Sequence, residues 1–142
     1  MSQENLLQHN KALMSVIRQL PGCIFWKDKR LVYLGCNLNL AALSGREKPE
    51  NVIGKSDFDM PWHERAEEVR AADTYVIQND KTISFKEEIT SANGWKVFFL
   101  TTKRALKIDE EIVGIIGNSV DITEQETWKL STKSLCVKLG KP

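Results

Sequence analysis

The stretch Glu111-Ile-Val-Gly-Ile-Ile-Gly-Asn-Ser-Val-Asp-Ile-Thr123 decides the fold of this chain. Its β-branched residues predict a largely covered strand. Gly114 and Gly117 interrupt the strand, which indicates a close approach to the backbone. The stretch continues as Thr123-Glu-Gln-Glu126, a capping box in which the threonine hydroxyl accepts from the N3 amide and the glutamate accepts from the cap amide. The sequence therefore predicts a buried strand that runs directly into a helix, so that strain in the strand reaches the helix.

Length and charge narrow the class of protein. The chain has 142 residues, 42% of them hydrophobic, which is enough for one domain with its own core. The net charge of +1 favours neither nucleic acid nor an anionic membrane as a partner. No apolar run approaches the ~20 residues of a membrane span. We expect no nucleic acid, no membrane span in this chain and no signal peptide.

The cysteines indicate the compartment. Cys23, Cys36 and Cys136 are odd in number and lack a Cys-x-x-Cys spacing. Structural disulfides and a metal site are therefore not expected, and a reducing cytoplasm is the natural location.

An amphipathic helix is predicted at the N-terminus. Its apolar stripe is a short heptad seam with one polar member: Leu6, Asn10, Leu13, Ile17 and Leu20. A polar residue such as Asn10 in a seam fixes the register of a two-stranded coil. Two interpretations stay open: a dimerisation seam, or a cover for the sheet of the same chain.

The rest of the chain alternates between short strands and helices. Strands are predicted over 23–27, 31–36, 83–90 and 95–106, and helices over 38–44 and 62–79. Together with the strand predicted in 111–123, these elements give an α+β fold: a five-stranded antiparallel sheet with short helices on one face. We divide the chain into the N-terminal helix 1–20, the domain 21–123 and an exit helix or linker, 124–142, helical to about Leu139.

Several motifs in this order resemble a PAS domain of the kind attached to bacterial sensor histidine kinases. They are Leu20-Pro-Gly22, Trp26-Lys-Asp28, Tyr33-Leu-Gly-Cys-Asn37, the run 53–62 and Gly117-x-x-x-Asp121-Ile-Thr123. The resemblance implies the sheet order 2-1-5-4-3 and a sensor of a small molecule, redox state or partner. It also implies a homodimer, a signal relay through Asp121 and Thr123, and an effector such as a histidine kinase in a two-component system.

The chain departs from such kinases past Thr123, where 19 residues remain without a phosphoacceptor-histidine box or a nucleotide-binding glycine motif. We expect either an excised sensor or a module that docks to a separate partner. No nucleophile with a base, metal cluster or phosphate loop is apparent, so the domain itself is not expected to be an enzyme and has no catalytic residues.

Cofactor-binding relatives guide the cofactor prediction. In haem-binding PAS domains the axial histidine aligns with Glu68, and His63 lies too early in the helix. In photoactive flavin domains the reactive cysteine aligns with Asp57, and the flavin contacts align with Phe99 and Ser119. No cofactor is therefore predicted. Flavin binding without an adduct stays open, as does an unknown small-molecule ligand.

Residues between the sheet and the helices are candidates for the lining of a ligand cavity: Trp26, Tyr75, Phe85, Glu87, Phe99, Thr101 and Ser119. Glu87 shares the inward face of its strand with Phe85, and a buried carboxylate needs a partner. Glu87 either anchors a cationic or hydroxylated ligand, pairs with Lys103 or Arg104, or is turned outward by a bulge. The alternative function is a ligand-free interaction module whose core is filled.

Overall fold

The computed structural model describes residues 2–129. Its five-stranded antiparallel sheet has the order β2-β1-β5-β4-β3, which confirms the predicted α+β fold and strand order. The strands are β1 (Cys23–Asp28), β2 (Tyr33–Cys36), β3 (Ile83–Thr90), β4 (Lys96–Ile108) and β5 (Glu111–Asp121).

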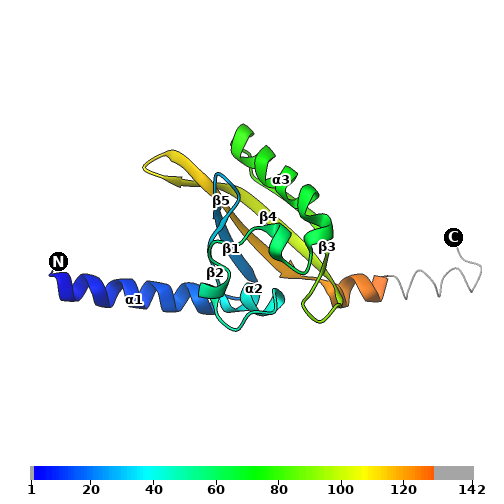
Figure 1. The fold of residues 1–142 in the computed structure, drawn as a ribbon, viewed down its shortest axis with the longest axis horizontal. Helices are drawn as coiled ribbons and strands as arrows, with labels where there is room; N and C mark the ends of the chain where they lie inside the picture. The colour runs from blue at the N-terminus through cyan, green and yellow to red at the C-terminus, as the bar shows by residue number, and fades with distance from the viewer. Residues whose placement is uncertain (1, 130–142) are drawn as a thin grey trace, which may run out of the picture.

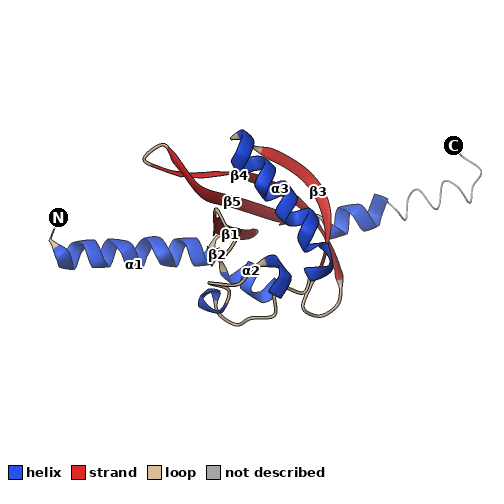
Figure 2. Ribbon diagram, turned by 45° about the horizontal axis from the view of Figure 1, so that its top comes forward, coloured by secondary structure: helices blue, strands red, loops and turns tan. Residues whose placement is uncertain are grey.

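Helices cover one face of this sheet (Figures 1 and 2). They are α2 (Leu38–Leu43), α3 (Ala66–Asn79) and three 3₁₀ turns, η1 (Pro49–Asn51), η2 (Asp57–Asp59) and η3 (His63–Arg65). The core lies between the sheet and these helices, because the inward residues of β1, β4 and β5 share that face.

The stretch 111–123 contains the central strand, β5, which lies between β1 and β4. The predicted close approach at Gly117 is confirmed: a Cβ there would overlap the ring of Phe25 on β1. Phe25 is 6% exposed and pairs directly with Gly117, so the missing side chain makes room for the ring. This pairing fixes the position of Phe25 at the base of the site described below.

The N-terminal helix α1 (Gln3–Gln19) projects away from the domain (Figure 1). None of its residues is buried, and the side chains of Leu6, Leu13 and Leu20 are 49%, 48% and 38% exposed. Near its end Arg18 forms an ion pair with Glu50. The interpretation of α1 as a cover for the sheet of its own chain is therefore wrong, and its apolar stripe is left open.

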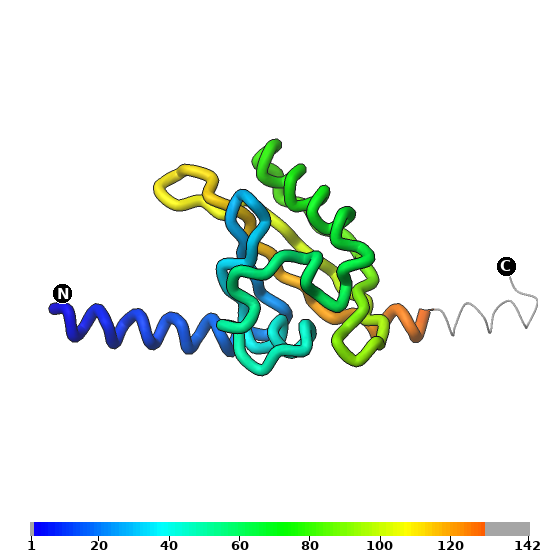
Figure 3. Tube along the Cα trace, viewed as in Figure 1, coloured from blue at the N-terminus to red at the C-terminus, as the bar shows by residue number. Residues whose placement is uncertain are grey.

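The end of β5 is tied to the neighbouring strand. Residues 123–129 are helical and follow β5 directly, as predicted (Figure 3). The capping box is wrong, however. The Thr123 hydroxyl accepts a hydrogen bond of 3.0 Å from the backbone N–H of Phe98 on β4, and Glu126 pairs with Lys86 at 2.9 Å. The Asp121 carboxylate accepts from the Thr123 N–H at 2.8 Å. The predicted continuation of the helix to Leu139 lies outside the described residues.

Candidate functional site

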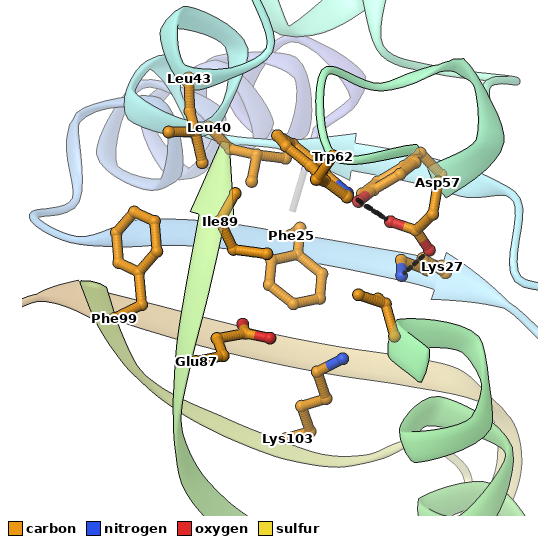
Figure 4. Close-up of a pocket in the computed structure, with 12 residues that line it drawn as sticks. Phe25, Lys27, Leu40, Leu43, Asp57, Trp62, Glu87, Ile89, Phe99 and Lys103 are labelled. Carbon is orange, nitrogen blue, oxygen red and sulfur yellow. Dashed lines mark hydrogen bonds and ion pairs between the residues drawn. The ribbon is translucent and has the colours of Figure 1, made fainter. Parts of the chain in front are cut away.

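A small cavity of about 30 Å³ lies between the sheet and the helices. Aromatic, aliphatic and charged side chains from both layers line it (Figure 4): Phe25, Lys27, Tyr33, Leu40, Leu43, Asp57, Trp62, Val69, Glu87, Ile89, Phe99 and Lys103. About one probe sphere of 10–15 Å³ is needed for a water, so the space holds very few atoms as it stands. A larger ligand would require its walls to move.

Four buried charges join at one side of this cavity. Lys27 on β1 donates to Asp57 at 2.7 Å and to Asp73 at 2.6 Å. Lys103 on β4 donates to the other oxygen of Asp73 at 2.7 Å. All four side chains are at most 1% exposed. This network, Lys27–Asp57–Asp73–Lys103, links two strands to η2 and α3, and its formal charges cancel.

Asp57 is the most heavily bonded member of the network. Besides the bond from Lys27, its carboxylate accepts a hydrogen bond of 2.8 Å from the hydroxyl of Tyr33 and one of 3.0 Å from the indole N–H of Trp62. Asp57 is the first residue of η2, whose cap is Ser56. The carboxylate of Asp57 therefore joins the turn η2 to the strands β1 and β2.

Burial and the network have opposite effects on the ionisation of Lys27 and Asp57. Burial lowers the pKa of Lys27, but Asp73 and Asp57 outweigh it and hold that pKa above its usual value. Burial raises the pKa of Asp57, but Lys27 and the donors Trp62 and Tyr33 hold it below the usual range. Burial, and then the charge of Asp57, place the pKa of Tyr33 well above its usual value. Lys27 and Asp57 are therefore charged, and the phenol of Tyr33 is neutral, at pH 7.

Glu87 enters the cavity from the opposite side, on β3. Its Oε1 accepts a hydrogen bond of 2.7 Å from the hydroxyl of Thr101. That hydroxyl is also hydrogen-bonded, at 2.8 Å, to the hydroxyl of Ser119. The predicted ion pair with Lys103 is wrong, because Lys103 turns to Asp73. Figure 4 shows Glu87 and Lys103 pointing into the same space beside the Phe25 ring. An acceptor and a donor thus face one cavity.

The predicted lining residues divide into three groups. Glu87 and Phe99 line the cavity, and Phe85 lines a groove next to it. Thr101 and Ser119 lie behind Glu87 in its hydrogen-bond chain. Whether these five bind a ligand stays a prediction.

The other two predicted residues are misplaced. Trp26 packs on Gly35 on the outer face of the sheet, because it alternates with the inward Phe25 and Lys27. Tyr75 is 50% exposed on the outer side of α3. The prediction that they line the cavity is wrong.

The sequence reasoning missed the buried network and the aromatic donors. A signal was present in β4, where Lys103 shares the parity of Phe99 and Thr101 and must therefore point inward. The same parity places Lys27 beside Phe25 on β1. Two inward lysines require buried carboxylates, which Asp57 and Asp73 supply.

Residues 2–129 contain neither a candidate metal site nor a candidate membrane span. No group of three histidine, cysteine or carboxylate side chains there could hold a metal ion. No helix in that part of the chain is long and apolar enough to cross a membrane.

Comparison with known proteins relates this architecture to characterised chains. A family model described as "PAS fold" matches residues 17–127. A solved structure described as "VqmA bound to DPO" is 27% identical, with a TM-score of 0.74 over 79% of this chain and 57% of that chain. A structure of the Vibrio cholerae VqmA dimer in the absence of its target DNA, described in connection with the DNA binding of LuxR-type receptors, is also 27% identical. Its TM-score is 0.75 over 80% of this chain and 53% of that one.

A curated relative is a protein of another kind. A diguanylate cyclase of Vibrio cholerae serotype O1 is 27% identical over 112 residues, which are 77% of this chain and 35% of the cyclase. The chain therefore spans little more than half of the two VqmA chains and about a third of the cyclase. The likeness therefore concerns only a part of each of these proteins.

Proposed function

The chain belongs to the PAS family, and from that premise we propose that it is the ligand-binding sensory domain of a LuxR-type transcription regulator similar to VqmA. The observation that carries the proposal is the combination of 27% identity to DPO-bound VqmA with a polar cavity at the centre of the fold. The domain itself is proposed to bind and relay, without catalysis, and to act in the cytoplasm.

The chemistry of the cavity selects the class of ligand. An ammonium group has three N–H donors. Lys103 gives one to Asp73, so others can serve a ligand. Thr101 occupies Oε1 of Glu87, so its second oxygen can accept from a ligand. Aromatic walls at Phe25 and Phe99 suit a flat ring. We propose a small, flat, neutral molecule with a donor beside an acceptor, and DPO is the first compound to test.

The partners follow from the same relatives. VqmA is described as a dimer with a target DNA, so the expectation of no nucleic acid does not extend to the whole regulator of which this chain would be part. Within the chain, we propose a homodimer through the open stripe of α1, with Asn10 in the seam. The expected histidine kinase receives no support from these relatives, and a DNA-binding effector replaces it in the proposal.

Isothermal titration of DPO into the purified chain tests the ligand. Glu87→Ala should weaken DPO binding, because Glu87 lines the cavity and its second carboxylate oxygen is the proposed acceptor. Glu88→Ala is the matched control, since Glu88 is the next residue on β3 and pairs with Lys96 at the surface. If the unmodified chain gave no heat of binding, or if both variants bound DPO with equal affinity, this cavity would not be the DPO site.

A second candidate output is a diguanylate cyclase, which the curated relative favours. Both outputs require the same sensory domain, so the DPO titration does not separate them. Fusing residues 1–129 to each type of effector and measuring DPO-dependent transcription or cyclase activity would do so. A response in only one fusion identifies the compatible output.

A further inference from the structure

Two surface grooves flank the central cavity and share walls with it. One, the α3–β3 groove, has a volume of about 220 Å³ and is lined by Arg65, Glu68, Val69, Ala72, Phe85 and Glu87. The other, the α2–β5 groove, has a volume of about 350 Å³ and includes Asn39, Leu43, Val97, Phe99 and Asp121. Each could lead from the surface to the cavity.

The wall between the cavity and the α3–β3 groove consists of side chains that can move. Val69 and Glu87 line both spaces, and both are only partly buried. Glu87 is held there by one side-chain hydrogen bond, from Thr101. Rotation of these two side chains would connect the spaces without breaking the β-sheet.

The wall on the other side is more firmly fixed. Leu43 and Phe99 line both the cavity and the α2–β5 groove. Phe99 is 3% exposed in the middle of the sheet. The carbonyl of Leu43 accepts a 3.0 Å hydrogen bond from the backbone N–H of Ala92, which ties α2 to the turn between β3 and β4. Opening this wall requires a core ring to leave its place.

We propose that ligands enter the cavity through the α3–β3 groove and that Glu87 selects them by charge. The four formal charges of the buried network cancel, so the network and the cavity lining together carry a net formal charge of −1, that of the Glu87 carboxylate. In the groove, Arg65 is paired with Glu68 at 2.8 Å, and it also donates to the carbonyl of Glu88. The entrance therefore carries a net negative charge, which admits neutral and cationic molecules and disfavours anions.

This inference rests on the proposed ligand-binding role of the cavity, but its test needs no ligand. The reporter is Ile89→Cys, which lines the cavity on the same face of β3 as Glu87. It is placed in a chain in which Cys23, Cys36 and Cys136 are alanine. Three methanethiosulfonates are used: the neutral methyl, the cationic 2-aminoethyl and the anionic 2-sulfonatoethyl reagent. Each forms a mixed disulfide with the thiolate and releases methanesulfinate. Rates are divided by those of the same reagent with free cysteine.

Two plugging variants identify the route. Ala72→Trp fills the α3–β3 groove, and the smaller Ala72→Phe is the substitute if the first variant does not fold by circular dichroism, because neither changes the charge of the groove. Asn39→Trp fills the other groove and is the matched control. The proposal expects Ala72→Trp to slow all three reagents by a similar factor and Asn39→Trp to slow none. Equal rates in the reporter and in Ala72→Trp, or a loss of rate in Asn39→Trp, would overturn the route.

A further variant identifies the selecting residue. Glu87→Gln removes the charge and keeps the size of the side chain. The cation-to-anion rate ratio should fall by roughly tenfold, on the scale of a unit charge acting over a few ångströms near water. The rate of the neutral reagent should change little. An unchanged ratio would overturn the role of Glu87, and it would do so whether or not the chain binds DPO.

Discussion

Removing the charge of Asp73 tests the energetics of the buried network. Asp73 is the shared partner of Lys27 at 2.6 Å and Lys103 at 2.7 Å, and none of the three is more than 1% exposed. Asp73→Asn keeps the shape but leaves two ammonium groups with one carboxylate, Asp57. Breaking a buried pair by removing one partner costs about 3–5 kcal/mol. For a domain of this size that corresponds to a melting temperature lower by roughly 10–20 °C.

Urea denaturation followed by tryptophan fluorescence, together with thermal unfolding, measures this loss. Asp80→Asn is the matched control, because Asp80 forms an exposed pair with Lys107 at 2.8 Å, and such pairs contribute about 0–1 kcal/mol. Lys103→Met should cost less than Asp73→Asn, since Asp73 then keeps Lys27. If Asp73→Asn lost no more than about 1 kcal/mol, like the control, the premise that the network is a desolvated set of paired charges would fail.

Three further predictions concern pH, the exit helix and the dimer. Because the pKa of Asp57 lies below its usual 3.8 in the folded state, its contribution to stability is complete above that pH and is lost as pH falls through the lowered pKa. The raised pKa of Lys27 has the opposite effect: its contribution to stability is complete below pH 10.5 and is lost as the pH rises through the raised pKa. In unfolding measured as a function of pH, Asp57→Asn should reduce the loss of stability at acid pH. Thr123→Ala should cost about 1 kcal/mol and speed amide exchange at Phe98, while Thr123→Ser should not; equal exchange in both variants would contradict the tie to β4. Leu13→Glu should shift sedimentation from dimer to monomer without changing the circular dichroism spectrum, and an unchanged sedimentation coefficient would remove α1 as the dimer seam.

Local pattern was sufficient where one physical preference dominated. The β-branched run of β5 is a central strand, and Gly117 is a glycine because the Phe25 ring occupies the space of its side chain. Alternation along β3 placed Glu87 inward, and the structure agrees. Motif order supplied the strand topology, which periodicity alone does not specify.

Local pattern failed where partners come from distant segments. Thr123 matches a capping box, but its hydroxyl binds Phe98, 25 residues earlier in the chain. One of the interpretations of Glu87 paired it with Lys103 on the neighbouring strand, but α3 supplies a competing carboxylate, Asp73. An acceptor takes the donor that the fold brings closest, whatever their separation in sequence.

The sequence by itself determined the strands and the α+β class, because backbone preference and side-chain alternation are properties of the chain read locally. The order of the sheet came from the resemblance of its motifs to a PAS domain. Only the tertiary structure decided the content of the site. Lys27, Asp57, Asp73 and Lys103 lie on four different elements, up to 76 residues apart, and strand parity, which turns the two lysines inward, does not say which carboxylates they meet. Their burial is tolerable only as a complete set, since each charge needs its partners once water is removed.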